Sequence, residues 1–390
     1  MKIDPYHSKE KYENWLKKGG FKDLSEENSK ILLEYLEDMR NGYNVTRPGP
    51  RSYIRLNNLR QRLRWISLQL KKHYNIDDMT KISKREITCF FNDLMRNGII
   101  KNKFGKLYKS VADYANTFKA FWHWYQKRQE DLDQPVKDIT IYIDMSPVSE
   151  RSFVYLTIDD VKKMAMQASF YYRTLIWFLF DSGIRAPTEL MNIKVENLRL
   201  IESGHYELTI REEVSKTFGR KPKLILSSEI LKEYIEINNL TSEDYIFYKR
   251  PGTMTKYIRN LALKSLGNKK TRGGEEIRRI SMYDFRHSSA CYWLPRYKSE
   301  SAYKFRFGWK ENKMIHYYTK LLGMKDTIQE NDIILSDVGK SKMGPQISVV
   351  NNSAEIMGSK YESEIKEMRD AMKKELVREI LKELNLGSLK

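Results

Sequence analysis

The sequence predicts a mainly α-helical protein that carries one small antiparallel β-sheet. Apolar residues recur at intervals of three and four through 25–128, which is the spacing of one helix face. Clear alternation of apolar and polar residues is confined to 206–226, as expected for a pair of strands. Between these regions, 129–155 loses the helical period and gathers prolines. We therefore expect an all-helical first domain joined to a mixed α/β second domain.

The first domain is predicted from four helical segments. The segment 24–42 has Ser25 in the N-cap position and ends at Gly42. A second helix covers 53–72, with a stripe formed by Leu56, Leu59, Leu63, Ile66 and Leu70. Its other face carries Arg60, Arg62 and Arg64, which we take as candidates for phosphate contact. Two more helices end at Gly98 and near Arg128, and the aromatic residues of the last one keep the period of a core.

Six segments follow from these patterns. We expect a polar leader at 1–24, a helical domain at 25–128, a linker at 129–155 and a second domain at 156–322. Thr157 and Asp160 form an S/T-x-x-acid cap where the second domain begins. A connector at 323–354 leads to an amphipathic helix at 355–387, which could form a coiled coil.

Charge is the strongest compositional signal. The chain has 70 lysines and arginines against 51 acidic residues, a net charge of +19, and such an excess attracts polyanions, of which nucleic acid is the commonest in a cytosol. The alternative is a surface charged only for solubility. No apolar run is long enough to span a bilayer, and the two cysteines fit a reducing compartment. We therefore expect a cytoplasmic protein with no membrane contact, cofactor or metal.

Four stretches in the second domain could carry chemistry. In "LFDSGIRAPTELMNIKVENL", a helix ends at Gly183, Arg185 follows the turn, and Pro187 is predicted to open another helix. Lys216 lies in the predicted hairpin of "YELTIREEVSKTFGRKPKLILS". The third stretch, "ISMYDFRHSSACYWL", contains Tyr283, Asp284, Arg286 and His287 at the start of a helix, and the fourth contains Trp309 and Tyr318.

These stretches, taken in order, resemble the tyrosine recombinases, or phage integrases, and most closely their archaeal and Xer-like members. The family pattern is "TGxR…ELxNL", a hairpin lysine, "HxLRH", "LGH" and "YTH", and this chain offers "SGIRAPTELMNI", "SKTFGRKPKLIL", "YDFRHSSA", "FGW" and "YYTKL". The resemblance covers 25–322. The family's nucleophile lies nine residues after the histidine of "LGH", and nine residues after Trp309 is Tyr318. Tyr317 is then a packing neighbour.

The resemblance implies a role for each matching residue. Arg185 and Arg286 would clamp the non-bridging phosphate oxygens, because guanidinium groups match phosphate geometry and stay charged. Lys216 would protonate the leaving 5′ oxygen, and Trp309 would donate its indole N–H to a phosphate oxygen. Tyr318 would attack and become a 3′-phosphotyrosine. The implied partners are double-stranded DNA and three further copies of the chain, assembled as a tetramer on two DNA sites in the nucleoid. The helical domain would be the core-binding part of a DNA clamp.

Three positions depart from the family pattern. Tyr283 stands where the first histidine of the box is expected, and a phenol is a poor base at neutral pH. Trp309 replaces the histidine of "LGH", and an indole can still donate a hydrogen bond. "RAPTEL" is one residue longer than the usual "RxSEL", which could shift Glu189.

Three functions remain open at this point. The first is site-specific DNA strand exchange, for integration or excision of a mobile element or virus or for resolution of chromosome dimers. The second is a DNA-binding regulatory protein that keeps the fold without the chemistry, which the Tyr283 position favours. The third is a type IB topoisomerase-like DNA relaxer, which would act without partner protomers or a defined site.

Overall fold

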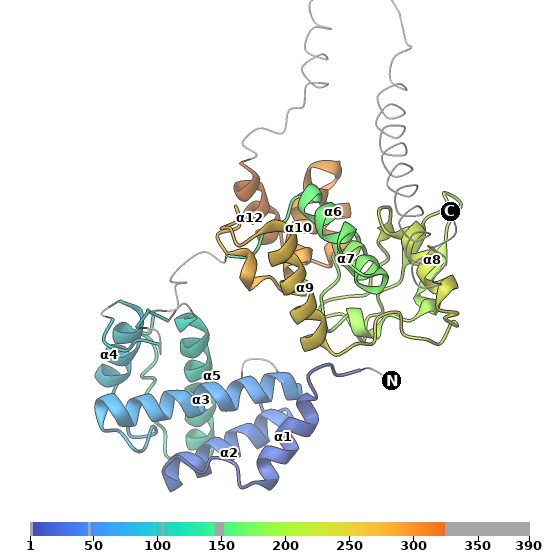
Figure 1. Ribbon diagram of the computed structural model, residues 1–390. Helices are drawn as coiled ribbons and strands as arrows, with labels where there is room; N and C mark the ends of the chain where they lie inside the picture. Colours follow the sequence, from blue (N-terminus) through green and yellow to red (C-terminus); the bar gives the residue numbers. More distant parts are fainter. Residues whose placement is uncertain are drawn as a thin grey trace, which may run out of the picture. The chain divides into compact units, whose positions relative to one another are not determined.

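The computed structural model describes residues 3–45, 48–96, 98–102, 105–108, 110–144 and 152–323. These residues form helices with one small sheet, as the sequence predicts (Figure 1). Within these ranges no helix is long and apolar enough to cross a membrane. The predicted helix at 355–387 and almost all of the predicted connector lie outside the described residues.

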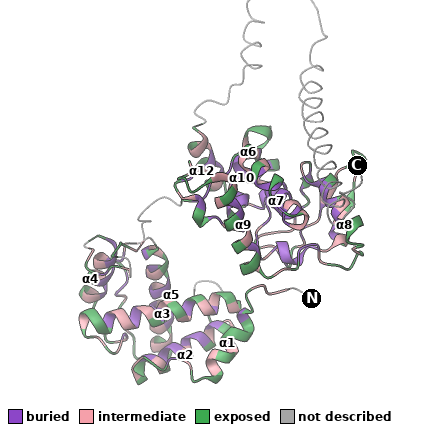
Figure 2. Ribbon diagram, viewed as in Figure 1, coloured by how far each residue is buried: buried purple, intermediate pink, exposed green. Residues whose placement is uncertain are grey.

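Five helices form the N-terminal half: α1 (Ser8–Lys17), α2 (Glu26–Asn41), α3 (Tyr53–Tyr74), α4 (Lys84–Met95) and α5 (Val111–Asp131). The Ser25 hydroxyl caps α2 by accepting the Asn28 N–H at 3.2 Å, and Gly42 ends the helix with a φ of 95°. The predicted apolar stripe of α3 is buried throughout (Figure 2). Both the ends of α2 and the core face of α3 are therefore confirmed.

Aromatic residues of α5 complete this core. Phe118 and Phe121 are fully buried, and Trp122 stacks on Phe118 with 6.1 Å between ring centroids. The Trp124 indole N–H donates to the Asp38 carboxylate on α2 at 2.8 Å. This confirms that the aromatic stripe belongs to the core, where large rings bury the most apolar surface.

Residues 1–24 differ from the predicted polar leader. They contain α1, which contacts α3, and the side chains of Tyr12 and Phe21 are buried in the same core as α5. Charged residues are frequent in the segment, and its two core positions are too few to produce an apolar stripe in the sequence. Their burial depends on the surface that α2 and α3 provide.

The C-terminal half consists of short helices and one small sheet. Its α-helices are α6 (Ile158–Met166), α7 (Phe170–Ser182), α8 (Ser228–Ile237), α9 (Pro251–Leu266), α10 (Met282–Trp293), α11 (Glu300–Phe307) and α12 (Lys313–Leu322). Its 3₁₀ helices are η1 (Leu190–Asn192), η2 (Val195–Asn197), η3 (Ile277–Arg279) and η4 (Leu294–Arg296). The predicted capping box of Thr157 and Asp160 is present at the start of α6.

Helix α7 is the centre of this half. Its apolar residues point in every direction, which is typical of a helix buried on all sides. Leu175, Ile176, Phe178 and Leu179 are completely buried, and α6, α8 and α10 contact it. The C-terminal end of α7, from which the chain continues to Arg185, is therefore held in a rigid surrounding.

The sheet consists of β1 (Leu198–Leu200), β2 (Tyr206–Leu208) and β3 (Lys223–Leu224), antiparallel in the order β1-β2-β3. Strands β2 and β3 confirm the predicted hairpin, and an isolated bridge between Ile210 and Arg220 extends it. Strand β1 was not predicted, because three residues are too few to show alternation. The connection between Ile210 and Arg220 carries Lys216.

Two expectations near the site are wrong in detail. Pro187 does not open an α-helix, because the chain passes through turns into η1 while the Glu189 carboxylate accepts the Arg185 backbone N–H at 2.9 Å. The end of the predicted linker also belongs to the folded domain. Phe153 and Val154 are buried, and the Val154 N–H donates to the Asp284 carboxylate of α10 at 2.8 Å.

Truncation of Leu63 to alanine should lower the free energy of unfolding by about 2 to 5 kcal/mol, because it leaves a cavity in the core of the N-terminal half. Ile54 lies on the same helix with 42% of its surface exposed, so Ile54→Ala is the matched control and should change little. Urea unfolding followed by circular dichroism measures both. Equal losses for the two variants would contradict the assignment of the buried face.

Candidate active site

Gly183 shapes the corner that precedes Arg185. Its φ is 57°, and a Cβ atom there would lie 2.3 Å from Cε1 of Phe307, so a side chain at this position would collide with α11. The Gly183 carbonyl oxygen accepts a hydrogen bond from Arg286 at 2.6 Å. The glycine of the "SGIR" stretch therefore brings α7, α10 and α11 together.

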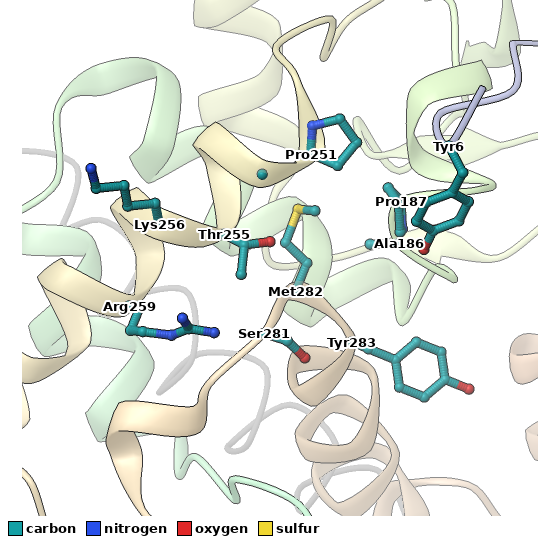
Figure 3. Close-up of a pocket in the computed structure, with 11 residues that line it drawn as sticks. Tyr6, Ala186, Pro187, Pro251, Thr255, Lys256, Arg259, Ser281, Met282 and Tyr283 are labelled. Carbon is teal, nitrogen blue, oxygen red and sulfur yellow. The ribbon is translucent and has the colours of Figure 1, made fainter. Parts of the chain in front are cut away.

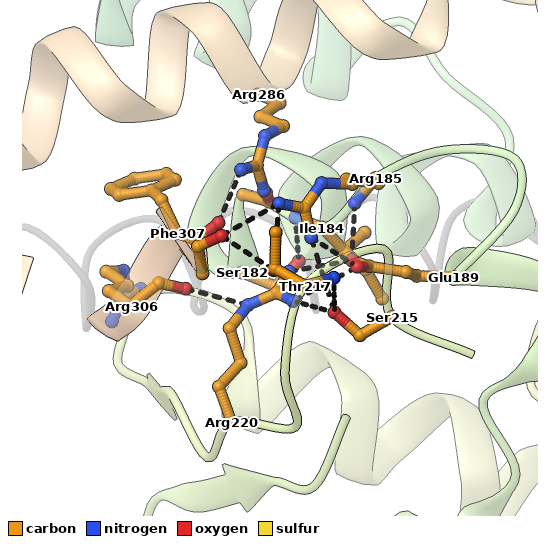
Figure 4. A network of polar contacts seen from close by, with 12 residues as sticks. Ser182, Ile184, Arg185, Glu189, Ser215, Thr217, Arg220, Arg286, Arg306 and Phe307 are labelled. Atoms are coloured by element: carbon orange, nitrogen blue, oxygen red, sulfur yellow. Dashed lines mark hydrogen bonds and ion pairs between the residues drawn. The ribbon is translucent and has the colours of Figure 1, made fainter. Parts of the chain in front are cut away.

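Glu189 holds two arginines in place (Figure 4). Its carboxylate accepts hydrogen bonds from Arg185 at 2.7 Å and from Arg220 at 3.1 and 2.7 Å. Burial alone would raise the pKa of the Glu189 carboxyl, but the hydrogen bond and charge of Arg220, together with the charge of Arg185, lower it to about 2. The longer "RAPTEL" spacing thus leaves Glu189 against Arg185, and it stays ionised at neutral pH.

Arg286 is a buried cation whose hydrogen-bond partners are carbonyl oxygens. It is 2% exposed and donates to the carbonyls of Gly183 and Phe307. Burial, and next the charge of Arg185, lower the pKa of the Arg286 guanidinium to about 10, so it remains protonated at neutral pH. A desolvated positive charge without a carboxylate partner is costly, which makes this position suited to an anion.

The loop that carries Lys216 is attached to Arg185 on both sides of the lysine. The hydroxyl oxygens of Ser215 and Thr217 each accept a hydrogen bond from Arg185 at 3.4 Å. The Thr217 hydroxyl also donates to the Gly308 carbonyl at 2.8 Å, and Arg185 donates to the same carbonyl at 2.9 Å. Lys216 itself is exposed, so its backbone is anchored beside Arg185 while its ammonium group faces solvent.

Trp309 and Tyr318 lie next to this arginine cluster. The guanidinium of Arg286 is 5.8 Å from the Trp309 ring centroid, and Trp309 stacks on Tyr318 with 5.7 Å between centroids. Tyr318 is 1% exposed, and burial raises the pKa of its hydroxyl well above the ordinary value. Tyr317 contacts Tyr318 edge to face at 5.2 Å and is half-buried, in keeping with its expected role as a packing neighbour.

His287 is a residue of the third stretch to which the sequence alone gave no role. Its Nδ1 lies 2.5 Å from the hydroxyl oxygen of Tyr318. His287 follows Tyr283 by four residues on α10, and the two rings meet edge to face at 5.2 Å. Two signals in the sequence point to it: His287 matches the second histidine of the "HxLRH" pattern, and it lies one helical turn after the position of the first histidine.

Tyr283 borders an open pocket, and the side chain in hydrogen-bond contact with the Tyr318 hydroxyl is His287. It is 42% exposed and lines a pocket of about 490 Å³ together with residues of α9 and with Ala186 and Pro187 (Figure 3). Lys256 and Arg259 of α9 are the cationic residues of this lining. The pocket therefore continues the positively charged surroundings of Arg185 toward α9.

The three arginines proposed for phosphate contact on α3 have partners inside the N-terminal half. Arg62 pairs with Asp113 at 3.1 Å, and Arg64 pairs with Asp23. The Arg60 guanidinium lies 4.5 Å from the centroid of the Trp15 ring. These contacts join α3 to its neighbours, which makes the three side chains less available to a ligand than their exposed positions on the helix suggested.

Among the described residues, no three or more histidine, cysteine, aspartate or glutamate side chains form a group that could hold a metal ion. The charged groups of the site are guanidinium and ammonium groups with three buried carboxylates, Asp181, Glu189 and Asp284. Such a set of side chains is suited to an anionic ligand, because arginine binds planar anions through paired hydrogen bonds.

Comparison with known proteins identifies the fold. No protein-family model and no curated protein matches the chain. Among solved structures, the chain is similar to XerH site-specific recombinase bound to a palindromic difH substrate, with a TM-score of 0.55, 13% identity, and coverage of 82% of this chain and 99% of that one. It is also similar to a lambda integrase dimer bound to a COC′ core site, with a TM-score of 0.54, 15% identity, and coverage of 82% and 99%.

A third similar structure is the Tn1549 transposon integrase in complex with transposon right end DNA, with a TM-score of 0.52, 13% identity, and coverage of 80% and 99%. The chain therefore has the fold of the tyrosine recombinases. This confirms the fold class and the resemblance to integrases and Xer-like recombinases that the motifs suggested.

Replacement of Glu189 by glutamine should lower the free energy of unfolding at pH 7 by about 3 to 5 kcal/mol, because it leaves buried guanidinium charge without its carboxylate. The folded-state pKa of Glu189, about 2, is below its ordinary value of 4.5, so this stabilisation is complete above pH 4.5 and is lost as pH falls toward 2. The difference between wild type and variant should shrink over that range.

Urea unfolding at several pH values measures this difference. Glu243 pairs with Lys194 on the surface with 72% of its side chain exposed, so Glu243→Gln is the control and should change little at any pH. A constant difference between wild type and Glu189→Gln from pH 7 down to pH 2 would contradict the depressed pKa.

Proposed function

We propose that this protein is a site-specific tyrosine recombinase, which cleaves and rejoins DNA through a 3′-phosphotyrosine intermediate. The observation that carries the proposal is the convergence of Arg185, Arg286, Tyr318 and the loop that carries Lys216 around the chain segment Phe307–Trp309. These residues come from four separate parts of the sequence. Together they supply an anion clamp, a proton donor and a nucleophile, which are the groups that phosphodiester cleavage requires.

Arg185 and Arg286 bind the scissile phosphate in this proposal. Arg286 is a desolvated cation held by carbonyl oxygens, and Arg185 is oriented by Glu189 and by the Gly308 carbonyl. Both guanidinium groups are thus positioned before DNA arrives. Such preorganised charge stabilises the additional negative charge that develops on the non-bridging oxygens in the transition state.

Lys216 and Tyr318 carry the covalent step. The Tyr318 oxygen attacks phosphorus and forms the protein–DNA bond, the bond to the 5′ oxygen breaks, and Lys216 gives that oxygen a proton. Exposure of Lys216 on an anchored loop supports this role, because the ammonium group can follow the leaving strand. Religation reverses the step, so the phosphotyrosine conserves the bond energy and no nucleotide cofactor is needed.

The proposed partners are double-stranded DNA and further copies of this chain. The XerH, lambda and Tn1549 structures are DNA complexes, and another similar structure is a lambda integrase tetramer bound to a Holliday junction, with a TM-score of 0.51 and 16% identity. The net charge of +19 favours binding to a polyanion. We propose a tetramer on two DNA sites as the active assembly.

Incubation with nicked duplex DNA in EDTA should trap an SDS-stable, protease-sensitive adduct, because the nick lets the leaving strand diffuse away. The adduct should form with wild type and with Tyr317→Phe and should be absent with Tyr318→Phe. Denaturing electrophoresis of labelled DNA measures it. An adduct that survives in Tyr318→Phe and disappears in Tyr317→Phe would reverse the assignment of the nucleophile.

The same assay separates the two other functions. DNA that is bound without any adduct would favour the DNA-binding protein that lacks chemistry. Adduct formation and relaxation of supercoiled DNA on unrelated sequences would favour the topoisomerase-like function. Recombination between two copies of one defined sequence supports the recombinase.

Replacement of Lys216 by alanine should slow cleavage of ordinary DNA by about 10²- to 10⁴-fold, the usual contribution of a general acid. DNA with sulfur in place of the bridging 5′ oxygen should be cleaved by the variant at nearly the wild-type rate, because a thiolate leaves without a proton. Single-turnover adduct formation on both substrates measures this. Lys221→Ala, at another exposed lysine of the same hairpin, is the control. An equal defect on both substrates would contradict the role of Lys216 as proton donor.

A further inference from the structure

The nucleophile assigned above has a proton that must be removed. Tyr318 is buried, and burial favours its neutral form, so the hydroxyl will not ionise by itself at neutral pH. Attack by the oxygen therefore requires a group that accepts the proton during the step. The position that the family resemblance assigns to such a group holds Tyr283, which is itself a phenol and is 42% exposed beside the pocket on the α9 side.

His287 is in contact with the reacting atom. Its Nδ1 lies 2.5 Å from the Tyr318 oxygen, a contact shorter than an ordinary hydrogen bond that joins α10 to α12. An imidazole that is unprotonated at Nδ1 accepts the hydrogen bond that the hydroxyl donates. Residues 283 and 287 are one helical turn apart, so both point to the same side of α10.

The imidazole is held in this orientation by Phe153. The two rings stack with 4.5 Å between centroids. Phe153 is positioned in turn by its neighbours in the chain, because the Val154 N–H donates to Asp284 at 2.8 Å and the Leu156 N–H donates to Ser288 at 3.0 Å. Asp284 and Ser288 flank His287 on α10, so the segment that carries Phe153 is attached to the helix on both sides of the imidazole.

We propose that His287 is the general base of the reaction, which accepts the Tyr318 proton as the tyrosine oxygen attacks the DNA phosphorus. This inference rests on the proposed function. The proton moves from the Tyr318 oxygen to Nδ1 of His287, the bond between that oxygen and phosphorus forms, and the bond from phosphorus to the 5′ oxygen breaks. Lys216 protonates the 5′ oxygen. During religation the imidazolium returns its proton to Tyr318, so no other reactant is consumed.

The rate of cleavage should then depend on the protonation of the imidazole. As pH falls, a protonated His287 can no longer accept the proton, and cleavage slows. The titratable and charged groups around the pair are Tyr283, Arg286 and Cys291 on α10, Tyr303 on α11, Tyr317 on α12, and, close to Cys291, Tyr155 and Arg272. Arg286 interacts with the Tyr318 hydroxyl and keeps its charge at neutral pH.

The test is the single-turnover rate of adduct formation on nicked duplex DNA in EDTA, between pH 5.5 and 8.5. His287→Asn keeps an acceptor close to the position of Nδ1 but cannot take a proton at these pH values. We expect a rate lowered by about 10²- to 10⁴-fold, the loss of the acid limb of the profile, and unchanged DNA binding in a gel-shift assay. Imidazole added to His287→Ala should restore part of the rate.

His316→Asn is the matched control, because His316 is an exposed histidine on the other side of α12. Its rate and profile should equal those of wild type. A wild-type adduct together with an unchanged rate and acid limb in His287→Asn would overturn the role of His287 and leave the proposed function standing. Loss of the acid limb in Tyr283→Phe, with the limb kept in His287→Asn, would assign the base to Tyr283 and equally overturn the proposal.

A measurement without DNA tests the contact itself. In protein labelled at histidine, the His287 NMR signal is identified by its absence from His287→Asn, and its titration midpoint should move when Tyr318→Phe removes the hydroxyl group. A midpoint that does not move would show that the two side chains do not interact in solution, and would overturn the proposal even if wild type forms the adduct. Failure of wild type to form any adduct would instead count against the proposed function.

Discussion

A buried excess of positive charge is the constraint on which the second half of the structure depends. Four arginines converge below the surface, Arg185, Arg220, Arg286 and Arg306, while the buried carboxylates that pair with them are Glu189 and Asp181. The other hydrogen bonds of the guanidinium groups go to backbone carbonyls and to the hydroxyl groups of Ser215, Thr217 and Tyr297. Desolvated charge is costly unless most of its donors are hydrogen-bonded, so the chain around these arginines has little freedom to change.

This requirement explains why the end of α11 is so closely defined. The carbonyl oxygens of Arg306, Phe307 and Gly308 each accept a hydrogen bond from an arginine of another element. Gly308 has a φ of 60°, and a Cβ there would lie 3.2 Å from both Arg220 and Thr217. The same turn places Trp309 against Tyr318. The charges that would bind phosphate and the tyrosine that would attack it are therefore positioned by one short segment.

Consecutive residues of α10 contact two different parts of the site. Arg286 points into the arginine cluster, whereas His287, the next residue, contacts Tyr318 of α12. Asp284 and Ser288 connect the same helix to the segment of Phe153. One helix thus relates the anion clamp to the hydroxyl group that would attack. The departure at Tyr283 does not leave the Tyr318 hydroxyl without a basic neighbour, because His287, one helical turn further along, contacts it.

The sequence by itself determined the local structure and the order of the candidate site residues. The stripe of α3, the caps at Ser25, Thr157 and Gly183, and the hairpin that carries Lys216 follow from periodicity and turn chemistry, which act over a few residues. The tertiary structure alone decided the burial of Tyr12, the pairing of Glu189 with Arg220, and the contact of His287 with Tyr318. These contacts join residues distant in sequence, or depend on neighbouring elements, and therefore leave no periodic signal.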